Sequence, residues 1–280
     1  MNLELDDKRA LVTGSSAGIG AGIAKTLAAE GAIVFVHGRD LDRVNELVKT
    51  IRHAGGRAHA TIGDLATEQG CRAVGDTVMA EFGGLDILVN NAGGKTSAHC
   101  NDGVERLANA PWLETPWSDW LWTYEQNVGA AVRLIQRFVP GMREQGWGRV
   151  INISSTSGTQ TEPDLADYQP AKAAMINMTT GLAKSLAHTG VTANTVSPGT
   201  ILTETLVETF TAWAEQLGWG THDWSEIERR FTNEIMPQPV NHFGRPEDIA
   251  RMVALVASPL SSYMTGANYR VDGGACRSVN

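Results

Sequence analysis

The chain has 280 residues, of which 42% are hydrophobic and 19% are charged, so it is able to bury a sizeable core in one large domain. A formal net charge of −8 argues against a nucleic-acid partner, which needs a basic surface. The sequence has no signal-peptide pattern and no run of about 18 apolar residues, and we therefore expect a cytoplasmic protein with no membrane partner.

The cysteine content argues against a disulfide framework and against a thiolate metal centre. Cys71, Cys100 and Cys276 make an odd number and include no pair at CxxC spacing. His222 and Asp223 are neighbours in the sequence, but one such pair does not make a metal site. We expect no bound metal.

Short apolar runs alternate with segments of helical spacing along the chain. In chain order, the pattern predicts strand 9–13, helix 18–30, strand 32–36, helix 41–54, strand 58–62, helix 68–82, strand 86–90, helix 117–143, strand 148–154, helix 167–188, strand 191–196, helix 246–257 and strand 268–271. Strands that alternate with helices are joined by right-handed crossovers into a parallel sheet covered on both faces. We expect an α/β fold with a doubly wound parallel sheet of the Rossmann type, in a single domain that spans 1–280.

Two segments interrupt this alternation. Residues 95–116 form a polar insert, and residues 203–243 form a long excursion with helical patterning, which we interpret as a substrate lid. The aromatic side chains of the excursion include Phe210, Trp213, Trp219 and Trp224. They either cover a bulky substrate or pack the lid against its own domain or another subunit, and we slightly favour packing.

A glycine-rich turn with the sequence TGSSAGIG lies between the first strand and the first helix, from Thr13 to Gly20. Glycines there let the backbone approach a pyrophosphate at the positive end of the helix. The loop alone is weak evidence, because a flexible turn has a similar composition. The predicted dinucleotide contacts in this turn are Gly14, Ser16, Gly18, Ile19 and Gly20.

The choice between the two nicotinamide cofactors depends on the end of the second strand, His37-Gly38-Arg39. This position lacks the acidic residue with which NAD enzymes hold the ribose hydroxyls, and Arg39 is suited to pair with a 2′-phosphate. The alternative is a solvated arginine in a turn before Asp40. We favour NADP(H), with NAD(H) as the alternative.

Further cofactor contacts are predicted where the third and fourth strands end. Asp64 and Leu65 follow the third strand, and the carboxylate either accepts a hydrogen bond from the adenine amino group or caps the next turn. The sequence NNAG follows the fourth strand, where small residues suit a surface under a cofactor and the asparagines either contact it or tie strand ends together. Within the NNAG segment, the predicted cofactor contacts are Asn91, Ala92 and Gly93.

Tyr168 and Lys172 stand four residues apart on a predicted helix, which places both side chains on one face. A tyrosine with its ordinary pKa of about 10 is a poor base at neutral pH, and a nearby ammonium group lowers that pKa. Pro170 lies between them, and the first turn of a helix tolerates proline because its amides have no intrahelical partner. A Tyr/Lys pair at this spacing is, however, also common on plain helix surfaces.

Ser155 ends the fifth strand, and the catalytic residues of open parallel sheets gather at such strand ends. Its hydroxyl is suited to hold a substrate oxygen. The alternative role is a helix cap or a turn at the end of the strand.

Together these motifs resemble the classical short-chain dehydrogenase/reductase family, including its members similar to 3-oxoacyl-carrier-protein reductase. The resemblance runs from Lys8 to Gly274 and covers four motifs in order: T-G-x-x-x-G-I-G, N-N-A-G, a serine 13 positions before the tyrosine (168 − 155), and Y-x-x-x-K. Four ordered motifs are far more specific than any one of them.

The resemblance implies further roles. Asn127 matches an asparagine that supports a proton-relay water near the lysine, and both Tyr168 and Lys172 also contact the cofactor in the family. The P-G-x-x-x-T segment implies cofactor contacts at Pro198, Gly199, Ile201 and Thr203. The family also implies a homotetramer or a homodimer.

The predicted function is an NAD(P)(H)-dependent interconversion of a carbonyl and a secondary alcohol, in which Tyr168 is the acid and base. The alternative is a regulator or scaffold that binds a dinucleotide without turnover, and the presence of Ser155, Tyr168 and Lys172 disfavours it. A hydrolase that uses Ser155 is set aside because the glycines of a nucleophile elbow are missing. The motifs do not indicate which carbonyl or alcohol is the substrate.

Overall fold

A computed structural model describes residues 2–94, 112–163 and 165–278 of the chain. Of the polar insert predicted at 95–116, only 112–116 belong to the described residues. Cys100 lies outside them.

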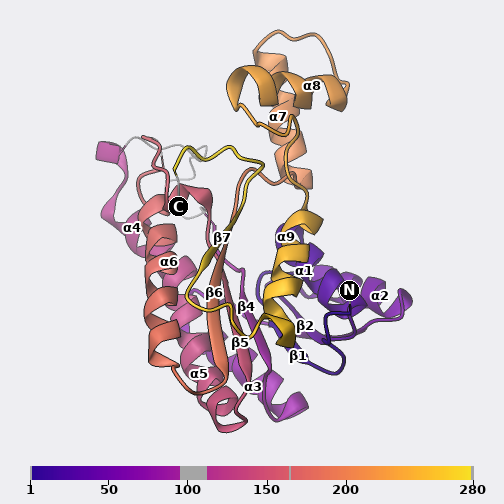
Figure 1. Cartoon of the computed structure of the whole chain (residues 1–280). Coiled ribbons are helices and arrows are strands. Elements are labelled where there is room, and N and C mark those ends of the chain that lie inside the picture. The colour runs from indigo at the N-terminus through magenta and orange to yellow at the C-terminus, as the bar shows by residue number, and fades with distance from the viewer. Residues whose placement is uncertain (1, 95–111, 164, 279–280) are drawn as a thin grey trace.

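Within the described residues, a parallel sheet of seven strands forms the middle layer, in the order β3-β2-β1-β4-β5-β6-β7 (Figure 1). The strands are β1 (Arg9–Val12), β2 (Ile33–Gly38), β3 (Arg57–Ile62), β4 (Ile87–Asn90), β5 (Gly148–Ile153), β6 (Val191–Pro198) and β7 (Asn268–Val271). The strand order reverses between β1 and β4, where a doubly wound sheet opens a crevice at its carboxyl edge. The predicted doubly wound parallel sheet is confirmed.

Helices cover both faces of the sheet (Figure 1). One layer contains α1 (Gly18–Ala29), α2 (Leu41–His53) and α9 (Pro246–Ala257), and the other contains α3 (Glu68–Phe82), α5 (Ala130–Glu144) and α6 (Tyr168–Ser185). Successive strand residues serve opposite layers: Ala10 and Val12 pack with the first, whereas Leu11 packs with the second. No helix in the described part of the chain is long and apolar enough to cross a membrane.

The prediction of one continuous helix over 117–143 is wrong at its middle. The chain forms α4 (Trp117–Tyr124), then a π-helical turn (Glu125–Gly129), and then α5. Asn127 explains the interruption, because its side-chain amide donates to the Thr123 carbonyl at 2.8 Å, the acceptor that its own backbone amide would use in an α-helix. Such π-helical turns occur frequently at functional sites.

The 203–243 excursion projects beyond the carboxyl edge of the sheet (Figure 1). It contains α7 (Glu204–Gln216), α8 (Trp224–Arg230) and a second π-helical turn (Phe231–Ile235). The segment has an apolar cluster of its own, formed by Phe210, Ala214, Ile227, Phe231 and Phe243, against which Trp219 and Trp224 pack. The centres of the Trp213 and Phe231 rings lie 5.1 Å apart. The aromatic side chains therefore pack against one another within the segment.

Candidate active site

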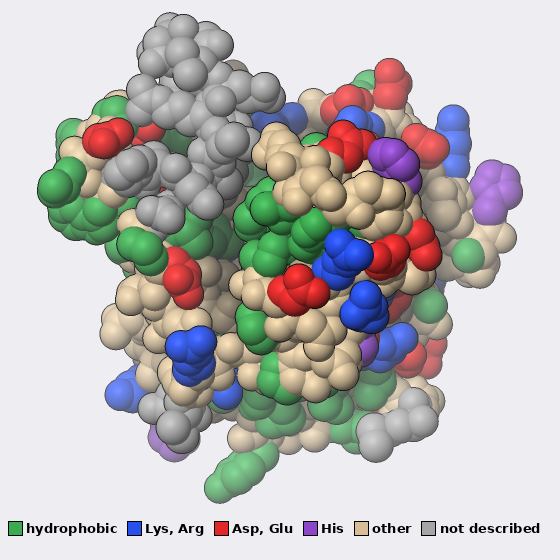
Figure 2. Space-filling view, turned by 90° about the horizontal axis from the view of Figure 1, so that it is seen from above, with side chains coloured by type: hydrophobic (Ala, Val, Ile, Leu, Met, Phe, Trp, Pro, Cys, Tyr) green, Lys and Arg blue, Asp and Glu red, His purple; other side chains and the backbone are tan. Residues whose placement is uncertain are grey.

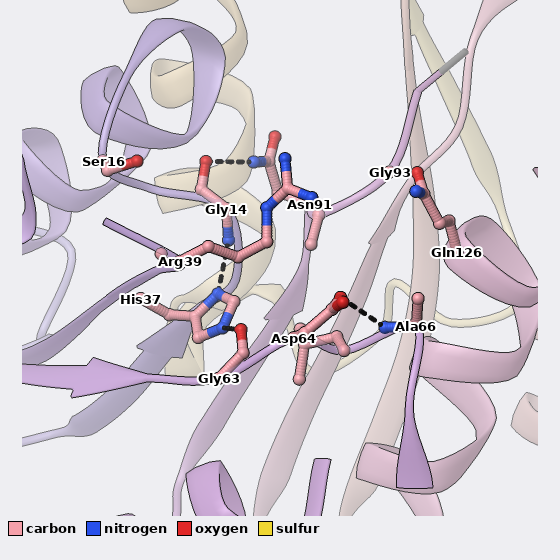
Figure 3. A pocket seen from close by; sticks show the side chains of 13 residues that line it. Gly14, Ser16, His37, Arg39, Gly63, Asp64, Ala66, Asn91, Gly93 and Gln126 are labelled. Atoms are coloured by element: carbon pink, nitrogen blue, oxygen red, sulfur yellow. Dashed lines mark hydrogen bonds between the residues drawn. The ribbon is translucent and has the colours of Figure 1, made fainter. Parts of the chain in front are cut away.

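A cleft of about 240 Å³ opens at the carboxyl edge where the strand order reverses (Figure 3). Its walls come from the glycine-rich turn after β1, the end of β2, the residues after β3 and the residues after β4. The predicted cofactor residues that line it are Gly14, Ser16, Arg39, Asp64, Leu65, Asn91, Ala92 and Gly93. Four segments predicted separately from the sequence therefore meet at one cleft.

The glycines of the turn fit where a side chain would not. Gly14 has a φ of +61°, and a Cβ on it would lie 2.9 Å from the Ala92 Cα. A Cβ on Gly20 would lie 2.4 Å from the Gly14 carbonyl oxygen. The residue before α1, Ala17, provides no side-chain cap, so the amides of the first helical turn face the carboxyl edge without one.

The two asparagines at the end of β4 tie strand ends together, which is one of the two roles predicted for them. The Asn91 side-chain amide donates to the carbonyl oxygens of Thr13, at 2.8 Å, and Gly14, at 3.1 Å. The Asn90 amide donates to the Asn152 side chain on β5 at 2.8 Å, and Asn152 in turn donates to the Thr179 hydroxyl at 2.7 Å. These bonds, of which the Asn90 and Asn152 bonds are buried, fix the strand ends on which the cleft is built.

Arg39 is exposed, and its side chain extends over the cleft (Figure 3). The neighbouring Asp40 does not line the cleft, and its carboxylate caps α2 by accepting from the amides of Asp42 and Arg43. Asp64 uses one carboxylate oxygen to accept from the Ala66 amide at 3.1 Å, which is the turn-capping role, and it also lines the cleft.

Three of the four predicted catalytic residues, all except Asn127, gather at the next strand end. Ser155 follows β5, while Tyr168 and Lys172 lie in the first turns of α6, with Pro170 in its first turn as expected. The Tyr168 phenol shares a hydrogen bond with the Ser155 hydroxyl. The Lys172 ammonium lies 5.5 Å from the centre of the Tyr168 ring and donates to the Ile153 carbonyl at 3.0 Å.

Burial governs the ionisation of this group. It raises the pKa of Tyr168, and the hydrogen bond with Ser155 only partly opposes that rise. Burial also lowers the pKa of Lys172 to about 8. The expectation that Lys172 lowers the Tyr168 pKa is wrong for this geometry, because the ammonium is directed at the Ile153 carbonyl.

Asn127 lies against the end of the NNAG segment. Its side-chain oxygen accepts from the Gly94 amide at 3.1 Å, and its side-chain nitrogen donates to the Gly94 carbonyl at 3.1 Å. The side chain is 1% exposed. The π-helical turn therefore clamps the segment that follows β4.

Comparison with known proteins shows the family of the chain. The family model described as short chain dehydrogenase matches residues 8–213. The chain belongs to the short-chain dehydrogenase family. It is 37% identical to an uncharacterized oxidoreductase of Bacillus subtilis, YvaG, over 100% of both chains. It is 32% identical to 7α-hydroxysteroid dehydrogenase of Escherichia coli, with 100% of this chain and 98% of the relative covered.

Solved structures agree with this membership. L-sorbose reductase from Gluconobacter frateurii, solved with NADPH and L-sorbose, superposes with a TM-score of 0.89 and 32% identity over 100% of both chains. The chain is accordingly an oxidoreductase that acts on alcohol or carbonyl groups, and the resemblance found in the sequence is confirmed. Nothing in these comparisons supports a catalytically silent regulator or scaffold.

Some residues predicted from the short-chain dehydrogenase motifs lie outside the cleft lining. These are the predicted cofactor contacts Gly18, Ile19, Gly20, Pro198, Gly199, Ile201 and Thr203, together with Asn127, Ser155, Tyr168 and Lys172. The segment after β6 nevertheless lies beside the glycine-rich turn, since a Cβ on Gly18 would lie 3.3 Å from the Thr203 methyl group. Thr203 caps α7, so this segment also forms the base of the excursion.

Other lining residues were missed from the sequence. They are His37, Gly38, Gly63, Ala66 and Gln126. His37 and Gly63 would have been found if every residue directly after a predicted strand had been listed as a candidate contact. Gln126 enters the cleft from the π-helical turn, which the helical pattern does not predict. Among the described residues, no histidine, cysteine and carboxylate groups are arranged to hold a metal ion.

Proposed function

We propose that this short-chain dehydrogenase uses NADP(H), in preference to NAD(H), to interconvert a carbonyl and a secondary alcohol. The observation that carries the proposal is the hydrogen-bonded Ser155 and Tyr168 pair, with buried Lys172 beside it, at the same sheet edge as the cleft. Ser155, Tyr168 and Lys172 are the proposed catalytic residues, and Asn127 is proposed to support a proton-relay water.

The cleft fits the adenosine half of a dinucleotide. Gly14, Gly18 and Gly20 have no Cβ to block a close approach, α1 begins without a side-chain cap, and Arg39 supplies positive charge for a 2′-phosphate. Asp64 and Leu65 are the proposed adenine contacts. Ile201 is proposed to bond the nicotinamide carboxamide, and Thr203 is proposed to contact the cofactor phosphates. The bound cofactor supplies the hydride chemistry.

The side chains of the site supply proton transfer and orientation. The Ser155 hydroxyl holds the substrate oxygen, and Tyr168 donates its phenolic proton to that oxygen during reduction and accepts it during oxidation. A raised Tyr168 pKa keeps the proton on the phenol at neutral pH, which suits the reducing direction. Lys172 is proposed to contact the cofactor, as the family resemblance implies.

The proposal also covers the domain, the lid and the oligomeric state. Residues 1–280 form a single domain in which the 203–243 excursion acts as the lid over the substrate. Its position beyond the carboxyl edge of the sheet supports this role (Figure 1). Following the family resemblance, we propose a homotetramer or homodimer that works in the cytoplasm.

A substrate screen with both cofactors tests the proposal. Its carbonyl compounds include ketoses such as L-sorbose and 7-oxo bile acids, because such compounds are bound in similar solved structures. We expect faster oxidation of NADPH than of NADH with at least one carbonyl compound. Arg39→Ala is expected to weaken NADPH use by roughly 10- to 100-fold, because it removes a charge-assisted hydrogen bond, and to leave NADH use unchanged. An unchanged preference for NADPH over NADH would refute the role of Arg39. Cofactor binding without turnover of any carbonyl compound would refute the proposed reaction.

A further inference from the structure

His37 is a buried imidazole at the floor of the cleft, near the end of β2. The residue is 3% exposed. Its Nδ1 accepts from the Gly14 amide at 2.9 Å, and its Nε2 lies 3.1 Å from the Gly63 carbonyl oxygen (Figure 3). One side chain thus bridges the glycine-rich turn after β1 and the end of β3.

These two contacts define the form of the imidazole. Nδ1 must lack a hydrogen in order to accept from an amide, so Nε2 carries the hydrogen and donates it to Gly63. Burial lowers the pKa of His37 to about 4, with Asp64 and Arg39 as the charged groups that face it. The ring is therefore neutral at physiological pH, and only the tautomer with its hydrogen on Nε2 makes both hydrogen bonds.

The backbone of His37 strengthens the same junction. Its amide donates to the Ser15 hydroxyl at 2.9 Å, and its carbonyl accepts from the Ser15 amide at 2.8 Å. On the other side of the turn, the Asn91 amide holds the Gly14 carbonyl at 3.1 Å. Gly14 is thus fixed at its N–H by His37 and at its carbonyl by Asn91.

We propose that His37 is a positioning residue for the dinucleotide, which locks the glycine-rich turn to the end of β3 and so sets the affinity for NADP(H) and NAD(H) alike. This inference rests on the proposed function. The turn with Gly14 forms one wall of the cleft, and the segment from Gly63 to Leu65 forms the facing wall. A cleft whose walls are fixed before binding loses less conformational freedom when it binds.

His37 and Arg39 should therefore act differently on the two cofactors. Both cofactors share the adenine and the pyrophosphate, and the walls tied by His37 are proposed to hold those shared groups. Arg39 is proposed to contact only the 2′-phosphate, which NADP(H) alone carries. Loss of the His37 bridge should weaken both cofactors, whereas loss of Arg39 should weaken one.

Three substitutions in the full-length protein separate the two bonds. His37→Phe keeps a ring of similar size and removes both bonds. His37→Asn keeps an acceptor near the Nδ1 position for the Gly14 amide, and His37→Gln keeps a donor near the Nε2 position for the Gly63 carbonyl. Dissociation constants for NADPH and NADH are measured by titration of nicotinamide fluorescence, which requires no turnover, and thermal unfolding is measured without cofactor.

We expect His37→Phe to raise the dissociation constants of both cofactors by about 10-fold, which corresponds to about 1.4 kcal/mol of binding free energy. His37→Asn should recover most of the affinity and His37→Gln less, because the Gly14 bond acts on the turn itself. Arg39→Ala should weaken NADPH only. His59→Phe is the matched control, because His59 contacts Phe35, Phe82 and Glu81 and does not line the cleft.

The outcomes are distinct. Unchanged dissociation constants in His37→Phe, even with a lower unfolding temperature, would overturn the inference, as would a loss confined to NADPH. If His37→Phe does not fold, wild-type affinity in both His37→Asn and His37→Gln would overturn it. A wild-type protein that binds neither dinucleotide would refute the proposed function instead.

Discussion

At the scale of single residues, Lys172 is a buried cation placed for chemistry and not for stability. Its side chain is enclosed, with the residue 4% exposed, and the ammonium donates to one backbone carbonyl, that of Ile153. Removing an ammonium group from water is costly, and the fall of its pKa to about 8 expresses that cost. Catalytic sites often keep such groups at the expense of the folded state.

Replacing Lys172 by methionine should therefore abolish activity and stabilise the fold at neutral pH. The folded pKa of about 8 lies below the ordinary value of 10.5. Between these values the unfolded chain retains a proton that the folded chain has released, so the wild type gains stability as pH rises through this window. We expect Lys172→Met to be more stable by on the order of 2 kcal/mol at pH 7, with the difference shrinking near pH 10.

Urea unfolding of both proteins at the two pH values measures this difference. The methionine retains most of the apolar stem, which keeps the packing comparable. A methionine variant that is less stable than the wild type at both pH values would contradict the account of Lys172.

At the scale of elements, the strands and most helices could be predicted because their apolar periodicities are regular. The π-helical turn could not, since Asn127 shows helical spacing in the sequence and its partner Gly94 is reached only in the folded chain. His37 was missed for a similar reason: its role depends on Gly14 and Gly63, which belong to two other strand ends. Pairings between distant segments are not visible in local patterns.

The space around two helical glycines predicts opposite effects of alanine substitution on stability. A Cβ on Gly20 in α1 would lie 2.4 Å from the Gly14 carbonyl and 2.5 Å from the Asn91 side-chain nitrogen. Gly20→Ala should cost about 1–3 kcal/mol and weaken dinucleotide binding, because the turn has to shift. A Cβ on Gly181 in α6 would meet nothing within 4 Å, so Gly181→Ala should stabilise by roughly 0.5–1 kcal/mol.

Chemical denaturation of the two alanine variants and the wild type distinguishes these effects. Both substitutions add the same methyl group to a helix, so the helix propensity is matched. Equal stability of the two variants would contradict this prediction, because it would show that the glycine-rich turn accommodates the added methyl group.

At the scale of the whole molecule, the carboxyl edge of the sheet carries the cleft and the catalytic group. The 203–243 excursion projects beyond the same edge (Figure 1). The excursion is fastened to the sheet layers at its base. Ile201 pairs with Gly244, and the Glu228 carboxylate binds both terminal nitrogens of Arg245, at 2.9 and 3.1 Å, just before α9 begins. Its aromatic cluster is internal, so the segment is held as a unit beside the site.

Figure 2 looks down on this end of the molecule and shows acidic, basic and apolar side chains intermixed on the described surface. No single kind of side chain there indicates one substrate class. Chemistry could be predicted from the sequence because it depends on a few motif residues. The substrate could not, because it depends on how the excursion and the sheet edge are shaped together.

The central claim is that Tyr168 exchanges a proton with a substrate oxygen while hydride is transferred to the adjacent carbon. The direct test incubates the full-length protein with NADPH deuterated at the transferable position and a carbonyl compound that the screen identifies. We expect the product alcohol to carry a single deuterium on its carbon by mass spectrometry. In Tyr168→Phe, we expect its formation to slow by roughly 100-fold or more while NADPH still binds. A product without deuterium, or an undiminished rate in Tyr168→Phe, would contradict the mechanism.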